Sequence, residues 1–345
     1  MRFDTRRAYV RRGLAIGGVK RFTVDVKRFP PSHRVGQPLT EVRGSPVVDC
    51  HQHLWPEAFI EELRRRRRPP RVRGWELQLD GEPPYAVDPA DHDPARRREF
   101  DEVDGVNLAL LSLSSPLGVE TMDPDAAAPL LESWHSLANE LDEHAGHGIW
   151  AAVNLVEPDL AALSVTLKHE RVHGLQIPAT GVADPAALTR LAPVLAVVEQ
   201  ADLPVLVHPG PAAAPSSDVP GWWPALASYP AQLAAAWFAW HVAGRSLLPR
   251  LRLAFVGLAG LAPLHHERLA QRGGELGPID PLVFYETSSY GTRAVDALVR
   301  VVGVDPLVHG SDRPYAQPTV PALGPAFDQA LLVVNPSHLL NGGPR

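Results

Sequence analysis

The sequence predicts an α/β protein built on a single (β/α)8 barrel, and three observations support this fold class. From Pro46 onward, short apolar runs rich in β-branched residues alternate with longer segments of helical periodicity. Eight such alternations occupy residues 46–341, as a (β/α)8 barrel requires. Runs such as 203–207 are apolar on both faces, which is typical of a parallel sheet covered by helices. A doubly wound open sheet is the alternative, but no glycine-rich phosphate-binding motif follows the first run.

The strands of this barrel are expected to alternate with helices. The strands are expected at 46–50, 107–113, 148–153, 172–177, 204–208, 251–256, 282–287 and 306–310. The helices between them are expected at 126–143, 157–168, 184–200, 230–246, 261–272 and 292–302. In 184–200 the apolar residues recur at three- and four-residue spacing, as in a helix packed on a sheet.

One segment, at about residues 69–90, interrupts this alternation after the first strand–helix unit. Trp75, Leu77 and Leu79 alternate with polar residues and lead into Asp80-Gly81, a pattern that predicts a β-hairpin. We expect this hairpin to be an insertion over the barrel mouth. The arginine run 64–68 before it is expected to be a solvated helix end, with anion binding as the alternative.

Composition narrows the function classes. The chain has 345 residues, a net charge of −6 and a pI near 6.2, which argue against a general nucleic-acid or membrane-surface binder. No apolar run reaches the roughly 18 residues of a membrane helix. Cys50 is the single cysteine, so an internal disulfide is impossible; we expect it to be a small buried residue. We therefore expect a cytoplasmic protein with a small-molecule substrate, as a possible homodimer.

The N-terminal residues 1–45 are basic and lack strong periodicity. They have neither the long apolar core nor the clear cleavage site of a secretory signal. We expect a poorly ordered extension here.

The motif His51-Gln52-His53 follows the first expected strand. Because side chains alternate along a strand, His51 and His53 project to the same side, with Asp49 below them. Two imidazoles on one face can chelate a divalent metal ion. Cys50 has the opposite parity and is expected to point away from this ion.

Two further strand ends carry residues of the metal-ligand type. The fifth expected strand ends at His208, and the eighth is followed by Asp312. Because the active site of a (β/α)8 barrel lies at the carboxyl ends of its strands, these side chains are expected to meet at the barrel mouth. Three neutral imidazoles and one carboxylate, with one position left for water, form a competent catalytic zinc or manganese site.

Substrate contacts are expected from aromatic residues and one arginine near these strand ends. Trp55 follows the histidine pair, and Trp222-Trp223 lie in the long loop after His208. Aromatic walls suit a flat or apolar substrate, with ordinary packing as the alternative. Arg313 could hold a substrate carboxylate in a bidentate pair, or it could brace its own loop.

Together these motifs resemble the amidohydrolase superfamily, and within it the amidohydrolase-related branch that includes aminocarboxymuconate semialdehyde decarboxylase. The resemblance spans residues 46 to 341. The motifs that carry it are Asp49-x-His51-x-His53, 98–107, His208, 249–253, 285–288, 310–314 and Asn335-Pro336. It implies that His51, His53, His208 and Asp312 bind one divalent metal, with Zn²⁺ expected and Mn²⁺ as the alternative. It also implies that Asp312 accepts a proton from water on that metal.

The sequence departs from the family pattern in two places. Gly257 stands where the family usually has a histidine after strand six, and Glu286 replaces the usual aspartate after strand seven. The missing histidine removes a candidate base or electrophile, a role typically worth about 10²–10⁴-fold in rate. Either Asp312 is then the only base, or another histidine substitutes for the missing one, or the protein has weak or no turnover. The possible substitutes are His241, His265, His266 and His309.

Three functions follow from these residues. We expect a metal-dependent hydrolase that acts on a small amide, lactone or similar carbonyl compound. The first alternative is non-oxidative decarboxylation of an aromatic or unsaturated carboxylic acid, against which the glycine at position 257 counts. The second alternative is a degenerate barrel that binds metal or ligand without turnover.

Overall fold

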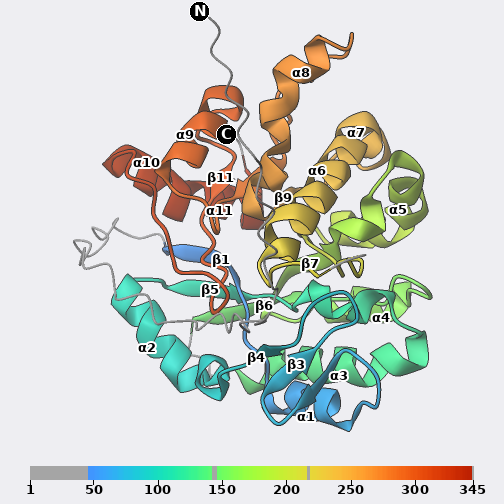
Figure 1. Ribbon diagram of the computed structural model, residues 1–345. Coiled ribbons are helices and arrows are strands. Elements are labelled where there is room, and N and C mark those ends of the chain that lie inside the picture. Colours follow the sequence, from blue (N-terminus) through green and yellow to red (C-terminus); the bar gives the residue numbers. More distant parts are fainter. Residues whose placement is uncertain (1–45, 142–145, 216–217, 344–345) are drawn as a thin grey trace, which may run out of the picture. The chain divides into compact units, whose positions relative to one another are not determined.

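A computed structural model describes residues 46–141, 146–215 and 218–343 (Figure 1). The predicted extension over residues 1–45 lies outside the described residues. The eight strands of the main sheet are parallel and are hydrogen-bonded in chain order. They are β1 (Val48–Gln52), β5 (Leu108–Leu111), β6 (His147–Ala151), β7 (Val172–Pro178), β8 (Val205–His208), β9 (Leu253–Phe255), β10 (Val283–Glu286) and β11 (Leu307–Val308).

The last strand returns to the first. The backbone N–H of Cys50 donates to the carbonyl of His309 at 2.9 Å, and that of Asp312 donates to the carbonyl of His51 at 2.9 Å. These bonds bring the end of β11 beside β1, so the sheet closes on itself. The predicted (β/α)8 barrel is confirmed, and each expected strand overlaps an observed one.

Helices surround this barrel (Figure 1). They are α1 (Glu57–Arg65), α2 (Pro94–Asp104), α3 (Pro124–Glu140), α4 (Leu160–Thr166), α5 (Pro185–Gln200), α6 (Tyr229–Ala239), α7 (Arg245–Leu247), α8 (His266–Ala270), α9 (Thr292–Val302), α10 (Pro325–Gln329) and α11 (Asn335–Asn341). Three of them begin at an Asp-Pro pair, at residues 93–94, 123–124 and 184–185. The aspartate accepts a free N–H of the first turn, and proline fits there because that turn needs no donor. Within the described residues, no helix is both long enough and apolar enough to cross a membrane.

Two predicted helices differ in detail from the observed ones. The segment 230–246 is helix α6 continued by the π-helical turn η6 (Trp240–Gly244) and by α7. The segment 261–272 begins instead inside η7 (Gly257–His265) and becomes α-helical only at α8. Residues 257–261 all have positive φ, between 52° and 64°, so the backbone there is left-handed and cannot continue an α-helix.

The insertion is a three-stranded antiparallel sheet rather than a single hairpin. Its strands are β2 (Arg71–Arg73), β3 (Glu76–Gln78) and β4 (Tyr85–Ala86). The predicted turn at Asp80-Gly81 lies between β3 and β4, as expected, but Trp75 lies in a second turn. Gly74, with a φ of +60°, makes that turn possible.

The tip of the insertion packs tightly on the barrel loops. A Cβ atom at Gly81 would lie 1.7 Å from the carbonyl oxygen of Ala212, in the loop that follows β8. Only glycine allows this approach. The tip of the insertion therefore contacts the loop that leaves the carboxyl end of β8, and its place over the barrel mouth stays a prediction.

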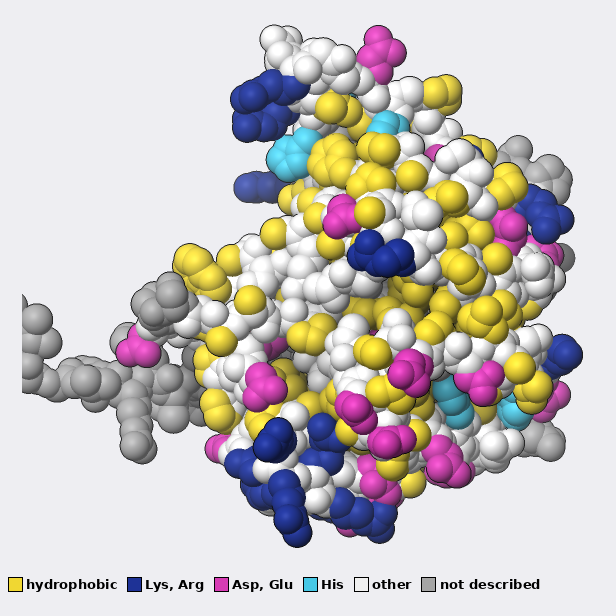
Figure 2. Space-filling view, turned by 90° about the vertical axis from the view of Figure 1, so that its right-hand side faces the viewer, with side chains coloured by type: hydrophobic (Ala, Val, Ile, Leu, Met, Phe, Trp, Pro, Cys, Tyr) yellow, Lys and Arg dark blue, Asp and Glu magenta, His cyan; other side chains and the backbone are white. Residues whose placement is uncertain are grey.

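Charged side chains are mixed over the visible face of the molecule. Figure 2 shows acidic side chains spread across the lower half of that face, with a group of Lys and Arg at its lower edge. In the arginine run, Arg64 pairs with Glu61 and lies over the ring of Trp75, and Arg65 pairs with Glu62. These contacts agree with a solvated helix end.

Candidate metal centre

Four predicted ligands meet at the carboxyl end of the barrel. His51 and His53 come from the end of β1, His208 is the last residue of β8, and Asp312 follows β11. One ligand atom from each lies within 4.8 Å of the others. The two Nε2 atoms of His51 and His53 are 3.0 Å apart, and His53 Nε2 lies 3.3 Å from Asp312 Oδ1. Residues separated by more than 250 positions thus form one cluster.

The outer ring nitrogens of two histidines are held by backbone carbonyls. His53 Nδ1 lies 2.9 Å from the carbonyl oxygen of Ser112, and His208 Nδ1 lies 2.9 Å from that of Pro209. A histidine that donates from Nδ1 keeps the lone pair of Nε2 free for a metal ion. Three nitrogen donors and one carboxylate oxygen suit zinc or manganese. The residues present therefore fit a divalent metal.

Glu286, at the end of β10, supports His51. It is fully buried, and its Oε2 atom lies 3.4 Å from His51 Nδ1. The same carboxylate accepts hydrogen bonds from the backbone N–H of Gly257 at 3.1 Å and from the hydroxyl of Ser288 at 2.8 Å. A Cβ at Gly310 would lie 2.2 Å from Glu286 Oε1, so glycine at 310 makes room for the longer acid. Glu286 is thus placed to orient His51, one of the four candidate ligands.

Asp49 joins the two ligand-bearing loops. Its Oδ1 atom accepts the backbone N–H groups of His51 at 3.1 Å and of Ser311 at 3.0 Å. Its Oδ2 atom accepts the Gln52 side-chain amide at 2.8 Å, and the same amide also donates to Asp101 on α2 at 2.8 Å. This buried network fixes β1 against the loop after β11, and hence fixes the candidate ligands from both.

Burial and neighbouring charges set the protonation of the three imidazoles. Burial lowers the pKa of His208, and the nearby His51 and His53 lower it further. Burial also lowers the pKa of His53, an effect that outweighs its hydrogen bond to Asp312. For His51 burial acts in the same direction, but Glu286 and the other carboxylates outweigh it and raise the pKa. The neutral imidazoles that a metal requires are therefore favoured at His53 and His208.

Asp312 is the most accessible member of the cluster. Its side chain is 22% exposed, whereas those of His51 and His53 are almost fully buried. Its backbone has a φ of +55°, a rare conformation for a residue other than glycine. A carboxylate in this position can contact both an ion in the cluster and a molecule entering from the mouth.

A phenol group that the sequence analysis missed lies beside the cluster. The Tyr315 ring lies 5.2 Å from the His53 ring, and its hydroxyl lies 3.5 Å from Ser114 Oγ. Tyr229, at the start of α6, donates a hydrogen bond to Glu82 of the insertion. The position of Tyr315, three residues after Asp312, was a usable signal. Nothing local marks Tyr229.

The predicted substrate contacts lie in different surroundings. Trp55 is buried, stacks on His92 with ring centroids 4.5 Å apart and donates to Ser114 Oγ at 3.1 Å. Trp222 and Trp223 are 53% and 42% exposed. The packing of Trp55 agrees with the alternative of ordinary packing. For all three tryptophans, contact with substrate stays a prediction.

Arg313 faces α2. Its guanidinium forms ion pairs with Asp104 and, at 3.5 Å, with Asp101, and it lies over the ring of Phe100. These contacts agree with the alternative in which Arg313 braces its loop. Its predicted contact with a substrate carboxylate stays a prediction.

Gly257 leaves space where the family pattern has a histidine. A Cβ there would make only ordinary contacts, at 3.8 Å, with the side chains of Leu233 and Tyr290. Three of the four candidate substitutes have other surroundings. His241 stacks on Trp237, His265 is exposed, and His266 faces the carbonyl of Pro263. His309 is buried, and its Nδ1 atom has no hydrogen-bond partner among the described residues.

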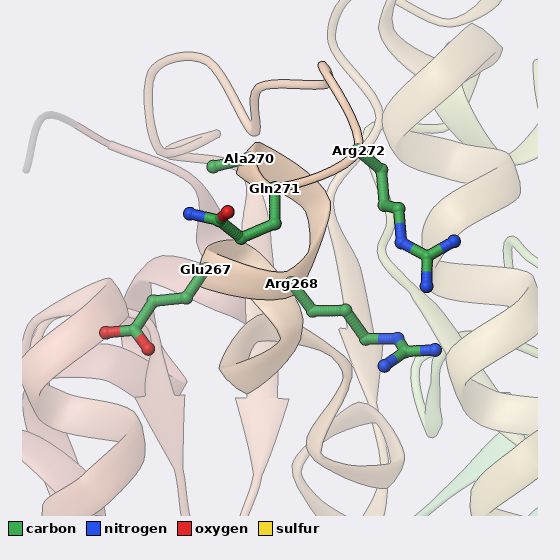
Figure 3. A pocket seen from close by; sticks show the side chains of 5 residues that line it. All are labelled: Glu267, Arg268, Ala270, Gln271 and Arg272. Carbon is green, nitrogen blue, oxygen red and sulfur yellow. The ribbon is translucent and has the colours of Figure 1, made fainter.

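A pocket of about 560 Å³ lies at the surface beside α8 (Figure 3). Its lining consists of Glu267, Arg268, Ala270, Gln271 and Arg272. In Figure 3 the two arginines point to one side and the glutamate points to the other. None of these residues belongs to the histidine–aspartate cluster, and the pocket is not part of the candidate site.

Comparisons with known proteins identify the fold. No protein-family model matches the sequence, and no curated protein matches it. Among solved structures, IDCase from Metarhizium anisopliae in its apo form is similar, with a TM-score of 0.67, 17% identity, and coverage of 88% of this chain and 98% of that one. The 5-carboxyvanillate decarboxylase from Sphingomonas paucimobilis has a TM-score of 0.64, 16% identity, and coverage of 86% and 99%.

A second 5-carboxyvanillate decarboxylase, from Novosphingobium aromaticivorans, was solved with manganese and 4-hydroxy-3-methoxy-5-nitrobenzoic acid. Its TM-score is 0.65, with 15% identity and coverage of 90% of this chain and 99% of that one. The chain thus has the fold of these enzymes over nearly their whole length.

Proposed function

We propose that this protein is a metal-dependent enzyme of the amidohydrolase superfamily that catalyses the non-oxidative decarboxylation of a small aromatic or unsaturated carboxylic acid. The observation that carries the proposal is the cluster of His51, His53, His208 and Asp312 at the mouth of the barrel. The similar structures support decarboxylation over the hydrolysis that the sequence favoured, since two of them are decarboxylases of an aromatic acid. Membership of the superfamily rests on the same fold and motifs.

The chain's own residues would perform three tasks. The three histidines and Asp312 would hold a divalent ion, which when bound binds and polarises an oxygen of the substrate. The partly exposed Asp312 carboxylate would accept or return a proton beside the reacting carbon. Glu286 would keep His51 oriented. Manganese is supported by one similar structure, and zinc by the donor set.

Hydrolysis of a lactone or amide is the second candidate, and Gly257 favours it. The decarboxylases of this family ordinarily use a histidine at that position, according to the resemblance described above. Hydrolysis needs only a base to activate water, a role that Asp312 can perform alone. A dimeric state remains a prediction in either case.

The test is metal analysis of the purified protein followed by assays of two substrate classes. We expect about one divalent ion per chain, and release of carbon dioxide from at least one member of a panel of hydroxybenzoates and related unsaturated acids. Ring opening of lactones without carbon dioxide release would support the second candidate. Protein without metal would contradict both.

A further inference from the structure

Helix α2 presents three charged side chains to the two segments that carry candidate metal ligands, the end of β1 and the loop after β11. Arg97, Asp101 and Asp104 are four and three residues apart, so they lie on one face of the helix. Arg97 and Asp101 are buried, and the Asp104 side chain is 37% exposed. Buried charges are costly unless they are paired or hydrogen-bonded, so the partners of these side chains indicate what this face does.

Arg97 and Asp101 hold the end of β1. The Arg97 guanidinium donates to the side-chain oxygen of Gln52 at 2.9 Å and to the backbone carbonyl of the candidate ligand His53 at 3.0 Å. Asp101 accepts the side-chain amide of Gln52 at 2.8 Å. This part of the helix face therefore fixes the backbone that carries two of the candidate ligands.

Asp104 holds the loop after β11 through Arg313. The Arg313 guanidinium forms an ion pair with Asp104, lies 3.5 Å from Asp101 Oδ1 and lies over the ring of Phe100. The backbone of the same residue is bonded to β1, since the N–H of His53 donates to the Arg313 carbonyl at 2.6 Å. Helix α2 is thus bonded to both ligand-bearing segments, and these segments are bonded to each other.

Asp312 lies between these contacts in a rare backbone conformation. Its φ of +55° is uncommon for a residue with a side chain. Its N–H donates to the carbonyl of His51 at 2.9 Å, and the next residue is Arg313. A residue keeps such a conformation only where the surrounding contacts over-determine it. Those contacts include the two backbone bonds to β1 and the ion pair between Arg313 and Asp104.

Asp101 cannot replace Asp104 as the partner of Arg313. Its Oδ1 atom accepts the amide of Gln52 at 2.8 Å, and its Oδ2 atom lies 2.9 Å from His147 Nε2, so both oxygens already have partners. The contact of 3.5 Å with Arg313 is longer than a normal hydrogen bond. Loss of the Asp104 carboxylate would therefore leave the loop without its short contact to α2.

We propose that Arg313 and Asp104 are positioning residues of the metal centre. Their ion pair holds the loop after β11 on α2 and so keeps the Asp312 carboxylate close to the two histidines of β1. This inference rests on the proposed function, in which these residues bind a divalent ion. It means that a partly exposed charge outside the ligand cluster sets how tightly the ion is held.

The experiment measures the Kd for Zn²⁺ by competition with a chromophoric chelator in D104N, R313Q and the double variant D104N/R313Q. Each single variant should raise Kd about 10-fold, the lower limit for loss of a group that orients a metal ligand. The double variant should raise it no further, because both substitutions remove the same ion pair.

Asp296→Asn is the matched control. Asp296 pairs with Arg300 on α9 at 3.0 Å, and its side chain is 42% exposed, close to the 37% of Asp104. D296N should bind Zn²⁺ as wild type does. An equal rise of Kd in D296N and D104N would refute the proposal, because the loss would then follow from any surface ion pair.

A variant without the aspartate ligand tests whether the pair acts through Asp312. Glycine adopts positive φ without strain, so D312G removes the carboxylate and leaves the backbone unchanged. D312G should bind Zn²⁺ more weakly than wild type, and D312G/D104N should bind it no more weakly than D312G. A further rise of about 10-fold in D312G/D104N would mean that α2 acts on the histidines instead, and would overturn the assignment to Asp312.

Melting temperatures of the metal-free proteins separate positioning from stability. A partly exposed ion pair contributes little to stability, so metal-free D104N should melt close to wild type. A lower melting temperature with an unchanged Kd would show that the pair only stabilises the fold, which contradicts the proposal. The proposed function fails separately, if the wild type itself binds no divalent ion.

Discussion

Replacing Glu286 by glutamine tests the support of the metal ligands. The carboxylate is fully buried and lies 3.4 Å from His51 Nδ1. It also accepts the backbone N–H groups of Gly257 and Ser288 and the Ser288 hydroxyl. Glutamine has nearly the same shape, so the barrel should fold. Its amide has one acceptor oxygen instead of two, and no charge to hold His51.

The size of the effect follows from this geometry. Loss of a partner that orients a metal-bound histidine typically lowers metal affinity by about 10–100-fold, which corresponds to about 1.4–2.8 kcal/mol. All four ligands remain in E286Q, so the loss should stay within this range. We expect a larger Kd for Zn²⁺ or Mn²⁺ and nearly unchanged secondary structure.

Competition with a chromophoric chelator measures this Kd. Glu132→Gln is the matched control, because Glu132 is exposed on α3. Equal affinities for wild type and E286Q would refute the argument that Glu286 orients His51. If E286Q instead fails to fold, Glu286 contributes to stability. That contribution would be measured as a lower melting temperature of the metal-free variant than of the metal-free wild type.

Three further outcomes are expected. His208→Ala removes one of four ligands and should lower bound metal several-fold by elemental analysis; unchanged metal content would exclude β8 from the site. Asp312→Asn should keep the melting temperature while abolishing turnover, and full activity would show that Asp312 is not the proton acceptor. Burial lowers the pKa of His135 to about 4, against an ordinary value of 6.5. Below pH 6.5 the unfolded chain therefore binds more protons than the folded one. The free energy of unfolding should fall by at most about 3 kcal/mol as the pH falls from 6.5 to 4. In His135→Gln, urea titrations should show a smaller loss; an identical loss would assign the pH dependence to other groups.

Much of the fold could be read from local patterns. Each barrel strand is a short apolar run between helical segments, and this alternation is a property of neighbouring residues. The start of a helix can also be predicted from pairs such as Asp184-Pro185. The left-handed stretch from Gly257 to Leu261 could not be predicted, since three of its five residues ordinarily avoid positive φ.

The candidate ligands were predictable for a similar reason. A parallel barrel places the carboxyl ends of all its strands at one mouth. The sequence could therefore predict that four residues meet there, without knowledge of any distance between them: His51, His53, His208 and Asp312. The surroundings of those ligands could not be inferred in this way. Arg313 could equally face the substrate or α2, and only the packed structure puts Asp101 and Asp104 beside it.

The sequence by itself thus determined the barrel and the identity of the residues that can hold a metal, because both follow from local periodicity and from the rule that strand ends converge. Tertiary structure alone decided which groups surround them. Glu82 meets Tyr229 across 147 positions, and Gly310 makes room for Glu286 from a neighbouring strand. Such contacts depend on the path of loops and on close packing, which no periodic pattern in the chain records.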